Sequence, residues 1–490
     1  MEEALRTDII VAVALGAHAA SQVWVPLMRT RTAQEPASGA TIGLVGLASE
    51  DDVKASCQAA KRAAYDWGRI AAWDRGEILR KAADHAEQHL EEIAEWLVRE
   101  SGSVPAKAEF EVRLSIKALR VASAMSSQAE GDVLPSTTNR LSIARRRPIG
   151  VVGIIAPFNF PLYLAMRAVA PALAVGNAVV LKPDPRTAIC GGFVIARIFE
   201  DAGLPQGVLH VLPGDGDAGA QLCRDSNIGL VQFTGSTRAG RKVGALAGEH
   251  LKKVSLELGG KNALIVCHDA DLDIAASNAA WGGFLHQGQI CMASSRILVH
   301  ESVASAFTAK LAARAKALPA GDPMMSGMPL GPMIGAEQVD YARAVIDTSL
   351  SKGARLVVGG NPDGLFFPPT VLADVAEDSP AYTEELFAPV IAVTTFSTYE
   401  QAIAMANDSE FGLSVGVITN DIHRALTLTE ELDFGICHIN DQTVGDDVIN
   451  PFGGMGASGN GTSIGGPANW ELFTHWQWVT LKGVPPTYPF

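Results

Sequence analysis

The sequence predicts an α/β protein built around a doubly wound, mostly parallel sheet. After Pro148, compact apolar runs alternate with stretches of helical periodicity, and continuous apolar runs are typical of strands buried on both faces of such a sheet. With 48% hydrophobic and 19% charged residues, the composition is that of a folded globular chain, which excludes disordered and fibrous classes. At about 150 residues per domain, a chain of 490 residues predicts two or three domains.

The first 130 residues are expected to be mainly helical. An apolar stretch at Ile9–Val25 follows a start that carries three acidic residues against Arg6. This charge has the wrong sign for a secretory signal and the stretch is short for a membrane span, so we expect a buried element. From Glu50 to Glu130, apolar residues recur at spacings of three and four, which predicts long amphipathic helices.

The character of the sequence changes at Gly131–Pro148. The helical pattern gives way to short, polar, β-prone stretches that end in the run Arg145–Arg147. Charge runs usually face water, so a solvated hairpin is favoured over an anion site. Near the C-terminus, Trp476 and Trp478 alternate as in a strand. This pattern predicts an edge strand, and it fits burial against a partner subunit and packing on its own domain equally well.

Between these parts, two α/β regions are expected, with each strand of the first followed by helical periodicity. The strands of the first are predicted at Ile149–Ala156, Ala178–Leu181, Gly207–Leu212, Gly229–Phe233 and Lys253–Leu256. The second runs from about Glu257 to Ile436, with strands near Ala263–Val266, Arg296–His300, Arg355–Val358 and Ile391–Thr395.

Charge and cysteine content restrict the partners. Lys and Arg number 39 against 53 Asp and Glu, a net charge of −14. Such a surface repels nucleic acid and acidic membranes, so we expect neither as a partner and a small-molecule site instead. The six cysteines are scattered without a Cys-x-x-Cys pair or a His at ligand spacing. Reduced thiols, no metal site and a cytoplasmic location are therefore expected.

Cys291 differs from the other cysteines in its local setting. Gly288 and the polar Gln287 and Gln289 precede it, whereas the others lie in apolar or helical runs. A thiol that is exposed among hydrogen-bond donors can act as a nucleophile. From the local pattern alone, an inert small hydrophobic residue remains the alternative.

Two further polar residues follow buried strands. Glu257 stands between Leu256 and Leu258, and partial desolvation there would raise its pKa, as a general base near neutrality requires. A capping or salt-bridging glutamate fits this position equally. Asn159 lies between aromatic residues and prolines in Pro157–Pro161, where its amide could donate to an oxyanion or hold a turn.

Two glycine-bearing turns are candidates for binding a dinucleotide. Gly214–Gly219 matches Gly-x-Gly-x-x-Gly after an apolar run, but no acidic residue lies about twenty positions later. Phe233–Gly240 also places glycines between a strand and a helix, where backbone N–H groups could meet a phosphate. An ordinary βα turn fits either segment equally.

In this order and at these separations, the motifs resemble the aldehyde dehydrogenase superfamily over nearly all the chain after about residue 35. The most specific are Glu-Leu-Gly-Gly-Lys at Glu257–Lys261 and the Gly-Gln-x-Cys that ends at Cys291. They are supported by Pro157–Pro161, Lys182-Pro183, Phe233–Gly240, Glu384–Pro389 and Pro451–Gly454.

The resemblance implies an aldehyde dehydrogenase-like fold with three parts. These are a Rossmann-type, doubly wound cofactor domain, an α/β catalytic domain and a small β oligomerisation module. We expect them at residues 1–130 and 149–256, at residues 257–455, and at residues 131–148 and 470–490, respectively. A homodimer or homotetramer is expected.

The resemblance also implies roles for single residues. Cys291 is the nucleophile, Glu257 the general base, and Asn159 with the Cys291 N–H the oxyanion hole. Hydride leaves the thiohemiacetal for a nicotinamide, and water activated by Glu257 hydrolyses the thioester. Retention of Glu257 argues against a branch that uses coenzyme A in place of water. Lys182 completes the catalytic set and, with Glu385, holds the cofactor riboses.

The implied cofactor is NAD. Its binding set is Ala156, Pro157, Phe158, Lys182, Pro183, Asp184, Gly214, Phe233, Thr234, Gly235, Ser236, Leu258, Gly259, Glu385 and Phe387. Two positions depart from the family's pattern. Ala388 replaces a usual glycine, and Pro185 stands where NAD-selective relatives often carry an acid that repels a 2′-phosphate. With Arg186 adjacent, we expect NAD to be preferred and NADP to be accepted.

Three segments resemble the branch that includes benzaldehyde and vanillin dehydrogenases: Cys437–Val444, Gly456–Gly461 and Phe473–Val479. The implied substrate funnel is lined by Phe160, Tyr163, Leu164, Arg167, Ile290, Met292, Val444 and Phe452. Apolar and aromatic walls suit a flat ring. Arg167 could meet a ring hydroxyl or a carboxylate, so a semialdehyde of the succinic type is the alternative substrate. A catalytically silent relative is the second alternative.

Overall fold

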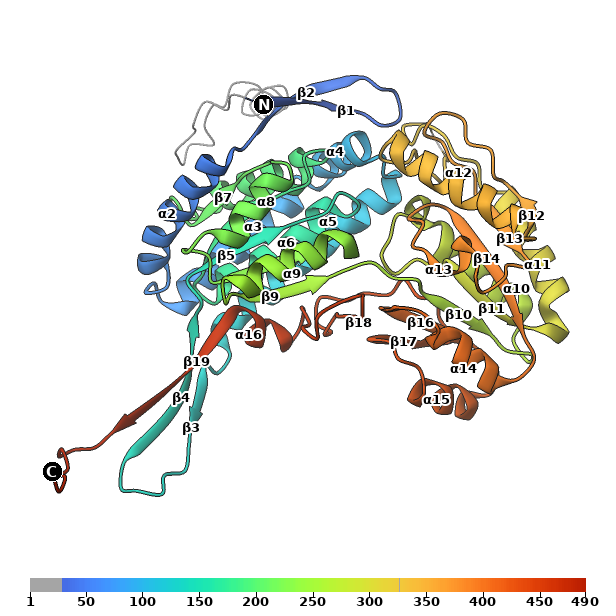
Figure 1. Ribbon diagram of the computed structural model, residues 1–490. Coiled ribbons are helices and arrows are strands. Elements are labelled where there is room, and N and C mark those ends of the chain that lie inside the picture. The colour runs from blue at the N-terminus through green and yellow to red at the C-terminus, as the bar shows by residue number, and fades with distance from the viewer. Residues whose placement is uncertain (1–28, 326) are drawn as a thin grey trace.

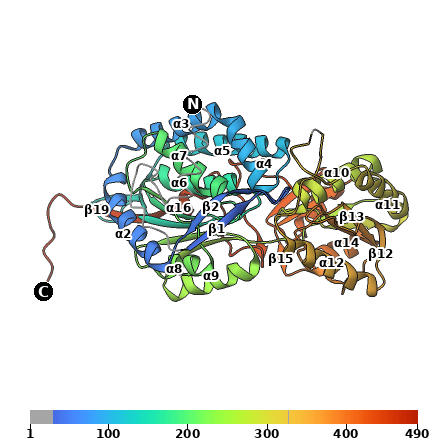
Figure 2. The same ribbon diagram turned by 90° about the horizontal axis from the view of Figure 1, so that it is seen from above.

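The computed structural model describes residues 29–325 and 327–490, so the expectation for Ile9–Val25 lies outside the described residues. The chain forms two lobes, each built around its own sheet, and a narrow arm that projects from the first lobe (Figure 1). Seen from above, the lobes lie side by side and the chain end extends away from the first of them (Figure 2). The predicted α/β class is confirmed.

The first sheet has five strands, all parallel, in the order β7-β6-β5-β8-β9. They are β5 (Val151–Ile155), β6 (Ala178–Lys182), β7 (Leu209–Val211), β8 (Leu230–Thr234) and β9 (Lys253–Glu257), and each falls where the sequence predicts a strand. The chain builds outward from β5 to the β7 edge and then returns to add β8 on the other side of β5. The strand order therefore reverses between β5 and β8, and doubly wound sheets bind ligands at this point, beyond the carboxyl ends of the strands.

Helices cover both faces of this sheet, as the apolar periodicity predicts. One group packs α2 (Glu50–Trp67) against β5, β6 and α8 (Gly216–Arg224), and α8 against α9 (Thr237–Glu249). The other group packs α3 (Ala72–Gln88) against α5 (Pro105–Ala124), α6 (Pro161–Ala174) and α7 (Val194–Asp201), with α4 (Leu90–Ser101) beside α5. Across residues 29–325 and 327–490, no helix combines the length and apolar character needed to cross a membrane.

The second lobe is built on a seven-stranded sheet with the order β12-β13-β14-β11-β10-β16-β17. The four predicted strands are present as β10 (Ala263–Val266), β11 (Arg296–His300), β12 (Arg355–Val358) and β14 (Val390–Phe396). Three strands were missed in the sequence: β13 (Thr370–Ala373), β16 (Ser414–Ile418) and β17 (Ile436–Ile439). All pairs are parallel except that of β12 with β13. Flanking helices are α10 (Leu272–Phe284), α11 (Glu301–Lys316), α12 (Ala336–Ser351), α14 (Tyr399–Asn407) and α15 (Ile422–Glu430).

The arm is a three-stranded antiparallel sheet of β3 (Gly131–Val133), β4 (Leu141–Pro148) and β19 (Thr474–Leu481). The predicted hairpin is β3–β4, and the Trp-containing strand β19 is an edge strand, as its alternation indicates. Arg146 stacks on Trp476, with the guanidinium carbon 4.1 Å from the ring centroid, and forms an ion pair with Glu471. Trp476 and Trp478 remain about half exposed or more, so the outer side of the arm has an uncovered aromatic surface.

The Gly-x-Gly-x-x-Gly segment follows β7 and runs into the first turn of α8. Since β7 is the outermost strand, this turn is at the edge of the sheet and not at the point where the strand order reverses. Its Asp215 forms an ion pair with Arg29 of the N-terminal hairpin, which consists of β1 (Arg29–Gln34) and β2 (Thr41–Leu47). The turn at the reversal point is instead the one between β5 and α6, which contains Asn159.

Candidate active site

The β5–α6 turn has a fixed conformation because its polar groups are bonded. Pro161 starts α6 at a position where a missing N–H costs nothing. The Asn159 side chain is buried, and its Nδ2 donates to the carbonyl of Gln289 over 2.8 Å. This bond ties the end of β5 to the loop of the second lobe that precedes Cys291.

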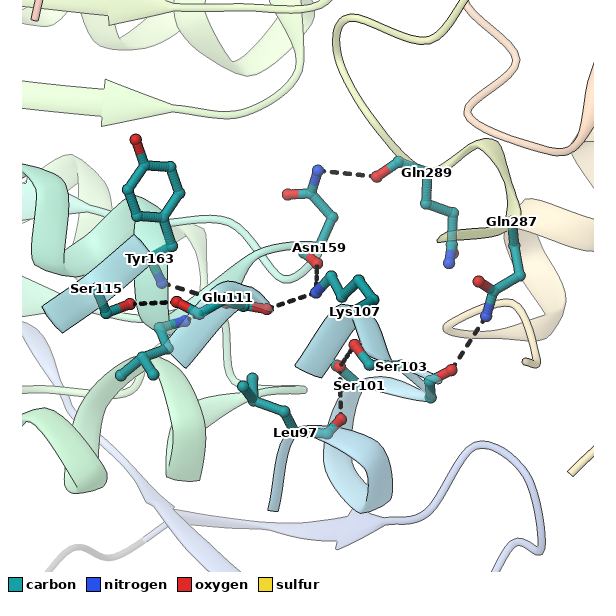
Figure 3. A network of polar contacts seen from close by, with 12 residues as sticks. Leu97, Ser101, Ser103, Lys107, Glu111, Ser115, Asn159, Tyr163, Gln287 and Gln289 are labelled. Carbon is teal, nitrogen blue, oxygen red and sulfur yellow. Dashed lines mark hydrogen bonds and ion pairs between the residues drawn. The ribbon is translucent and has the colours of Figure 1, made fainter. Parts of the chain in front are cut away.

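A buried ion pair on α5 supports the same turn (Figure 3). Lys107 Nζ lies 2.5 Å from Glu111 Oε2 and donates to the main-chain carbonyl of Asn159 over 2.8 Å. Lys107 Nζ also lies 3.9 Å from the ring centroid of Phe160. The other oxygen of Glu111 accepts the N–H groups of Leu162 and Tyr163 in the first turn of α6, where a negative charge is favoured. Both side chains are essentially excluded from water.

The Cys291 loop is held by side-chain amides. Gln287 donates to the carbonyls of Gly102 and Pro332, and the Gln289 oxygen accepts the N–H of Ile334. Cys291 itself is half-buried; of the six cysteines, four are buried and Cys437 is exposed. Burial and the neighbouring carboxylates of Glu385, Glu257 and Asp446 raise the pKa of the Cys291 thiol to about 12, and the cation of Arg167 acts in the opposite direction.

Glu257 ends β9 and is buried, 4% exposed. Within the described parts of the chain, neither of its carboxylate oxygens has a hydrogen-bond partner. Desolvation raises its pKa well above the usual value, and the nearby Arg167 opposes this rise. A buried carboxylate without a partner is costly to fold unless it serves a ligand or a reaction. Its main-chain carbonyl accepts the N–H of Gly235, which joins it to the turn after β8.

The two glycines after Glu257 make room for two neighbours. A Cβ on Gly259 would lie 2.1 Å from the carboxylate of Glu385, and a Cβ on Gly260 would lie 2.7 Å from the carbonyl oxygen of Cys291. The Gly260 N–H donates to Glu385 Oε1 over 3.2 Å. Burial raises the pKa of Glu385 to about 7, against the opposing effects of that N–H and of Lys261.

Further polar groups line the carboxyl end of the first sheet. Lys182 ends β6, and its buried Nζ donates to the carbonyl of Pro183. Asp184 binds the guanidinium of Arg186 through two hydrogen bonds of 2.9 and 2.8 Å. On the other side of the reversal point, Ser236 caps the N-terminus of α9 by accepting the N–H of Ala239. The ends of β5, β6, β8 and β9 thus present polar groups along one edge.

Arg167, expected in the substrate funnel, is paired with a residue that the sequence analysis did not identify. Asp446, in the loop between β17 and β18 (Met455–Gly456), accepts Arg167 Nη1 at 2.6 Å and the hydroxyl of Tyr163 at 2.9 Å through the same oxygen. Arg167 Nη2 donates to the carbonyl of Ile464 over 3.0 Å. The guanidinium carbon lies 4.4 Å from the ring centroid of Phe452. The buried cation thus meets an aromatic face and a carboxylate.

The remaining predicted residues are those of the apolar funnel and those of the cofactor set. The apolar funnel residues pack into the hydrophobic cluster of the first lobe, with Tyr163, Ile290, Met292 and Phe452 buried and Phe160, Leu164 and Val444 partly buried. Phe387, at a left-handed φ of 51°, stacks edge-on against Phe158 with centroids 5.7 Å apart. Gly214 is the exception among the predicted cofactor residues, because it lies by the edge strand β7.

Four residues that shape the site were not predicted: Lys107, Glu111, Asn262 and Asp446. Lys107 and Glu111 lie on the buried face of α5 together with Ala108 and Val112. Two opposite charges four residues apart on an apolar helix face are a sequence pattern that could have indicated a buried ion pair. The other two hold their positions through contacts distant in sequence, for which the local pattern gives no indication.

Comparison with known proteins agrees with this geometry. Residues 24–479 match the aldehyde dehydrogenase family, and the chain belongs to that family. It is an NAD(P)-dependent aldehyde dehydrogenase. It is 50% identical to a vanillin dehydrogenase from Amycolatopsis sp. and 46% identical to a benzaldehyde dehydrogenase [NAD(+)] from Pseudomonas putida; both alignments cover 93% of this chain and 94% of the relative. Betaine aldehyde dehydrogenase from Staphylococcus aureus in complex with NAD+ superimposes with a TM-score of 0.95 at 28% identity, covering 100% of this chain and 99% of that chain.

Proposed function

We propose that the protein oxidises an aromatic aldehyde to its carboxylic acid, with Cys291 as nucleophile and Glu257 as general base. The observation that carries this proposal is the convergence of the half-buried Cys291 thiol and the unpartnered Glu257 carboxylate. Cys291 and Glu257 approach closely enough for each to act on the buried Arg167. The segment Glu257–Gly260 joins them, since Gly260 lies against the main chain of Cys291.

The Cys291 thiol gives up its proton to water or to ionised Glu257, the resulting thiolate attacks the aldehyde carbon, and the carbonyl oxygen becomes an alkoxide. One N–H of the Asn159 side chain is bonded to Gln289, and an amide has a second N–H to donate. This second N–H and the main-chain N–H of Cys291 form the proposed oxyanion hole. Each such donor is worth about 3 kcal/mol in comparable sites. Lys107 fixes the Asn159 main chain and thereby aims the amide.

Glu257 serves the hydrolytic half of the reaction. Its raised pKa makes it a stronger base than an exposed glutamate, once it is ionised. Arg167 favours the ionised form and so limits the rise. Glu257 takes a proton from a water molecule, whose oxygen adds to the thioester carbon, and the Cys291 thiolate leaves as the acid forms.

The described residues fit a nicotinamide dinucleotide, which supplies the hydride acceptor when bound. Lys182 Nζ is buried with three N–H donors and bonds Pro183, so donors remain for ribose hydroxyls. The Glu385 carboxylate lies beside Gly259, away from Lys182. It can accept hydrogen bonds from the hydroxyl groups of the second ribose. The capped N-terminus of α9 presents N–H groups suited to the phosphates.

NAD use is supported by the family and by relatives that bind it. We propose that NADP is also accepted, less well, because position 185, where NAD-selective relatives often carry an acid, is a proline in this chain. The Arg186 guanidinium is occupied by Asp184, which limits its help to a 2′-phosphate. The ratio of kcat/KM for NADP to that for NAD tests this, with a value below one but measurable expected. No detectable turnover with NADP would contradict it.

The aromatic substrate is proposed from the relatives' names and from the apolar walls of the funnel. A panel of benzaldehyde, 4-hydroxybenzaldehyde, vanillin and succinic semialdehyde, followed by NADH absorbance, tests it. We expect the three aromatic aldehydes to give the higher kcat/KM. Highest efficiency with succinic semialdehyde would replace the proposal with the semialdehyde alternative.

The nucleophile assignment is tested by Cys291→Ala, which should abolish NADH formation from every aldehyde. Cys437→Ala is the matched control, since Cys437 is the exposed cysteine and should keep full activity. Turnover by Cys291→Ala would refute the assignment. A wild-type protein without activity on the whole panel would favour a catalytically silent relative.

We further propose that the lobes divide the work. Residues 1–130 and 149–256, whose described part from residue 29 onward carries the five-stranded sheet, bind the dinucleotide. Residues 257–455 form the catalytic domain, and the arm joins copies of the chain. The exposed Trp476 and Trp478 and the unpaired side of β19 support a role in assembly. Sedimentation of wild type and of Trp478→Glu tests this, with a shift from dimer or tetramer toward monomer expected.

A further inference from the structure

The Arg167–Asp446 pair bears on which aldehydes the site admits. A free arginine in a substrate funnel would bind a carboxylate through two parallel hydrogen bonds. Here Nη1 is engaged by Asp446 at 2.6 Å and Nη2 by the Ile464 carbonyl at 3.0 Å. Each end of the guanidinium fork therefore already has an acceptor in the protein, and the charge of Arg167 is paired with a carboxylate.

The pair is buried, so the charge of Asp446 offsets that of Arg167 more strongly than it would at the surface. The side chains of Arg167 and Asp446 are 4% and 11% exposed. At such burial, electrostatic interactions are weakly screened by water. Tyr163 lies one helical turn before Arg167 and donates to the same Asp446 oxygen, which fixes the carboxylate toward α6.

The pair also adjoins the reactive groups. Arg167 and Asp446 influence both Glu257 and Cys291, and they do so with opposite signs. A substrate whose aldehyde meets Cys291 therefore brings its other end toward a cation that is already paired with a carboxylate. Arg167 Nε is buried and has no hydrogen-bond partner among residues 29–325 and 327–490, so this N–H and the second N–H of each Nη remain to donate to a neutral group.

Building on the proposed function, we propose that Asp446 is a specificity-determining residue that excludes carboxylate-bearing aldehydes by occupying and neutralising Arg167. The site then accepts an aromatic ring with neutral substituents, which the Tyr163–Asp446–Arg167 cluster can meet with single hydrogen bonds. A second carboxylate beside Asp446 would be repelled at short range, and Arg167, already paired with Asp446, would compensate little for its loss of water.

Two substrates of nearly equal shape isolate this effect: 4-formylbenzoate carries a carboxylate, and methyl 4-formylbenzoate carries a neutral ester. In the wild type we expect kcat/KM for the carboxylate to be at most about one tenth of that for the ester. Asp446→Asn keeps the volume of the side chain and frees the charge of Arg167. It should raise the carboxylate-to-ester ratio by at least about tenfold.

Two further variants complete the test. Asp447→Asn is the matched control, because the adjacent Asp447 pairs with Lys117 at a more exposed place; its ratio should equal that of wild type. The double variant Asp446→Asn/Arg167→Met lacks the cation. Its carboxylate-to-ester ratio of kcat/KM should fall back toward that of the wild type.

The outcomes separate this proposal from the one on which it rests. If wild type oxidises neither benzaldehyde nor the ester, the proposed function fails. If it oxidises both but the wild-type ratio is near one, the role of Asp446 is refuted, whether or not the variants fold. An unchanged ratio in folded Asp446→Asn refutes it as well, and a high ratio that persists in the double variant shows that Arg167 is not the cause.

Discussion

The Asn262 side chain donates a hydrogen bond to the main-chain carbonyl of Cys291 over 2.7 Å. The same Nδ2 donates to the carbonyl of Ala293, and Oδ1 accepts the N–H of Ser414 at the start of β16. One buried amide therefore fixes the loop of the proposed nucleophile to the second sheet.

Replacing that amide should loosen the loop. Asn262→Ala removes the partner of the Cys291 carbonyl and of the Ser414 N–H in a buried place, which costs about 1–3 kcal/mol for each group, whereas the Ala293 carbonyl keeps the N–H of Ser295. We expect a lower Tm and, in the folded fraction, a kcat reduced by about tenfold to a hundredfold. Asn278→Ala, an exposed asparagine on α10, is the control and should keep kcat. Unchanged kcat in Asn262→Ala would show that the loop holds its position without this contact.

The thiol of Cys291 should be poorly reactive in the free enzyme at neutral pH. Burial and nearby carboxylates raise its pKa to about 12, and below the pKa the thiolate fraction grows tenfold for each pH unit. Without cofactor or aldehyde, the rate of Cys291 alkylation by iodoacetamide, followed by peptide mass spectrometry, should climb from pH 7 to 10 without a plateau. A plateau below pH 9 would contradict the raised pKa.

Glu385 should make the fold pH-dependent. Its pKa is raised from 4.5 to about 7 in the folded protein, so the unfolded chain loses this proton at lower pH than the folded one. Its contribution to stability is complete below pH 4.5 and is lost as the pH rises through 7, by on the order of 3 kcal/mol at most. The Tm of Glu385→Gln relative to wild type should therefore increase between pH 5 and 7. Glu249→Gln, at an exposed position on α9, should show no such trend.

The space that Gly259 leaves for the Glu385 carboxylate can be tested by adding a methyl group. Gly259→Ala places a methyl group where the Glu385 carboxylate lies, and the carboxylate must move away. We expect a several-fold rise in KM for NAD with little change in Tm, because the displaced atoms are the end of a flexible side chain. Gly248→Ala on α9, where a Cβ meets nothing within 4 Å, is the control. An unchanged KM for NAD would remove Glu385 from the proposed cofactor site.

The Lys107–Glu111 pair should affect stability through its charges and activity through the hydrogen bond from Lys107 to Asn159. Lys107→Met leaves Glu111 buried and uncompensated, at a cost of about 3–5 kcal/mol. Lys107→Met/Glu111→Gln removes both charges and keeps an acceptor for the first turn of α6, so much of the Tm should return. The carbonyl of Asn159 still lacks its donor, and kcat should stay about tenfold low. Recovery of kcat together with Tm would show that the pair acts on folding alone.

The sequence predicts the first sheet better than the second for a physical reason. Strands such as β6 are buried on both faces and read as continuous apolar runs. β13 has only four residues after two prolines, and β17 contains Cys437 and His438. Such strands owe their conformation to pairing with neighbours, which a local pattern does not record.

The site divides in the same way. Glu257 and Asn159 stand out locally because polar groups follow buried strands, and Cys291 stands out because glycine and glutamine residues precede it in a loop. Asp446 has no local mark, and its partner on α6 is 279 residues away in the sequence. The sequence around Arg167 therefore fits a hydroxyl or a carboxylate as its partner, and the fold pairs it with Asp446.

Phe160 belongs both to the expected substrate wall and to the surroundings of the buried Lys107. For anyone redesigning the enzyme toward bulkier aldehydes, trimming Phe160 would also strip an aromatic face from a desolvated cation. Gains in substrate range at this position should thus be accompanied by lower heat resistance. Val444 lies on a loop of the other lobe, so enlargement there leaves the Lys107 contact intact and is the safer direction for engineering.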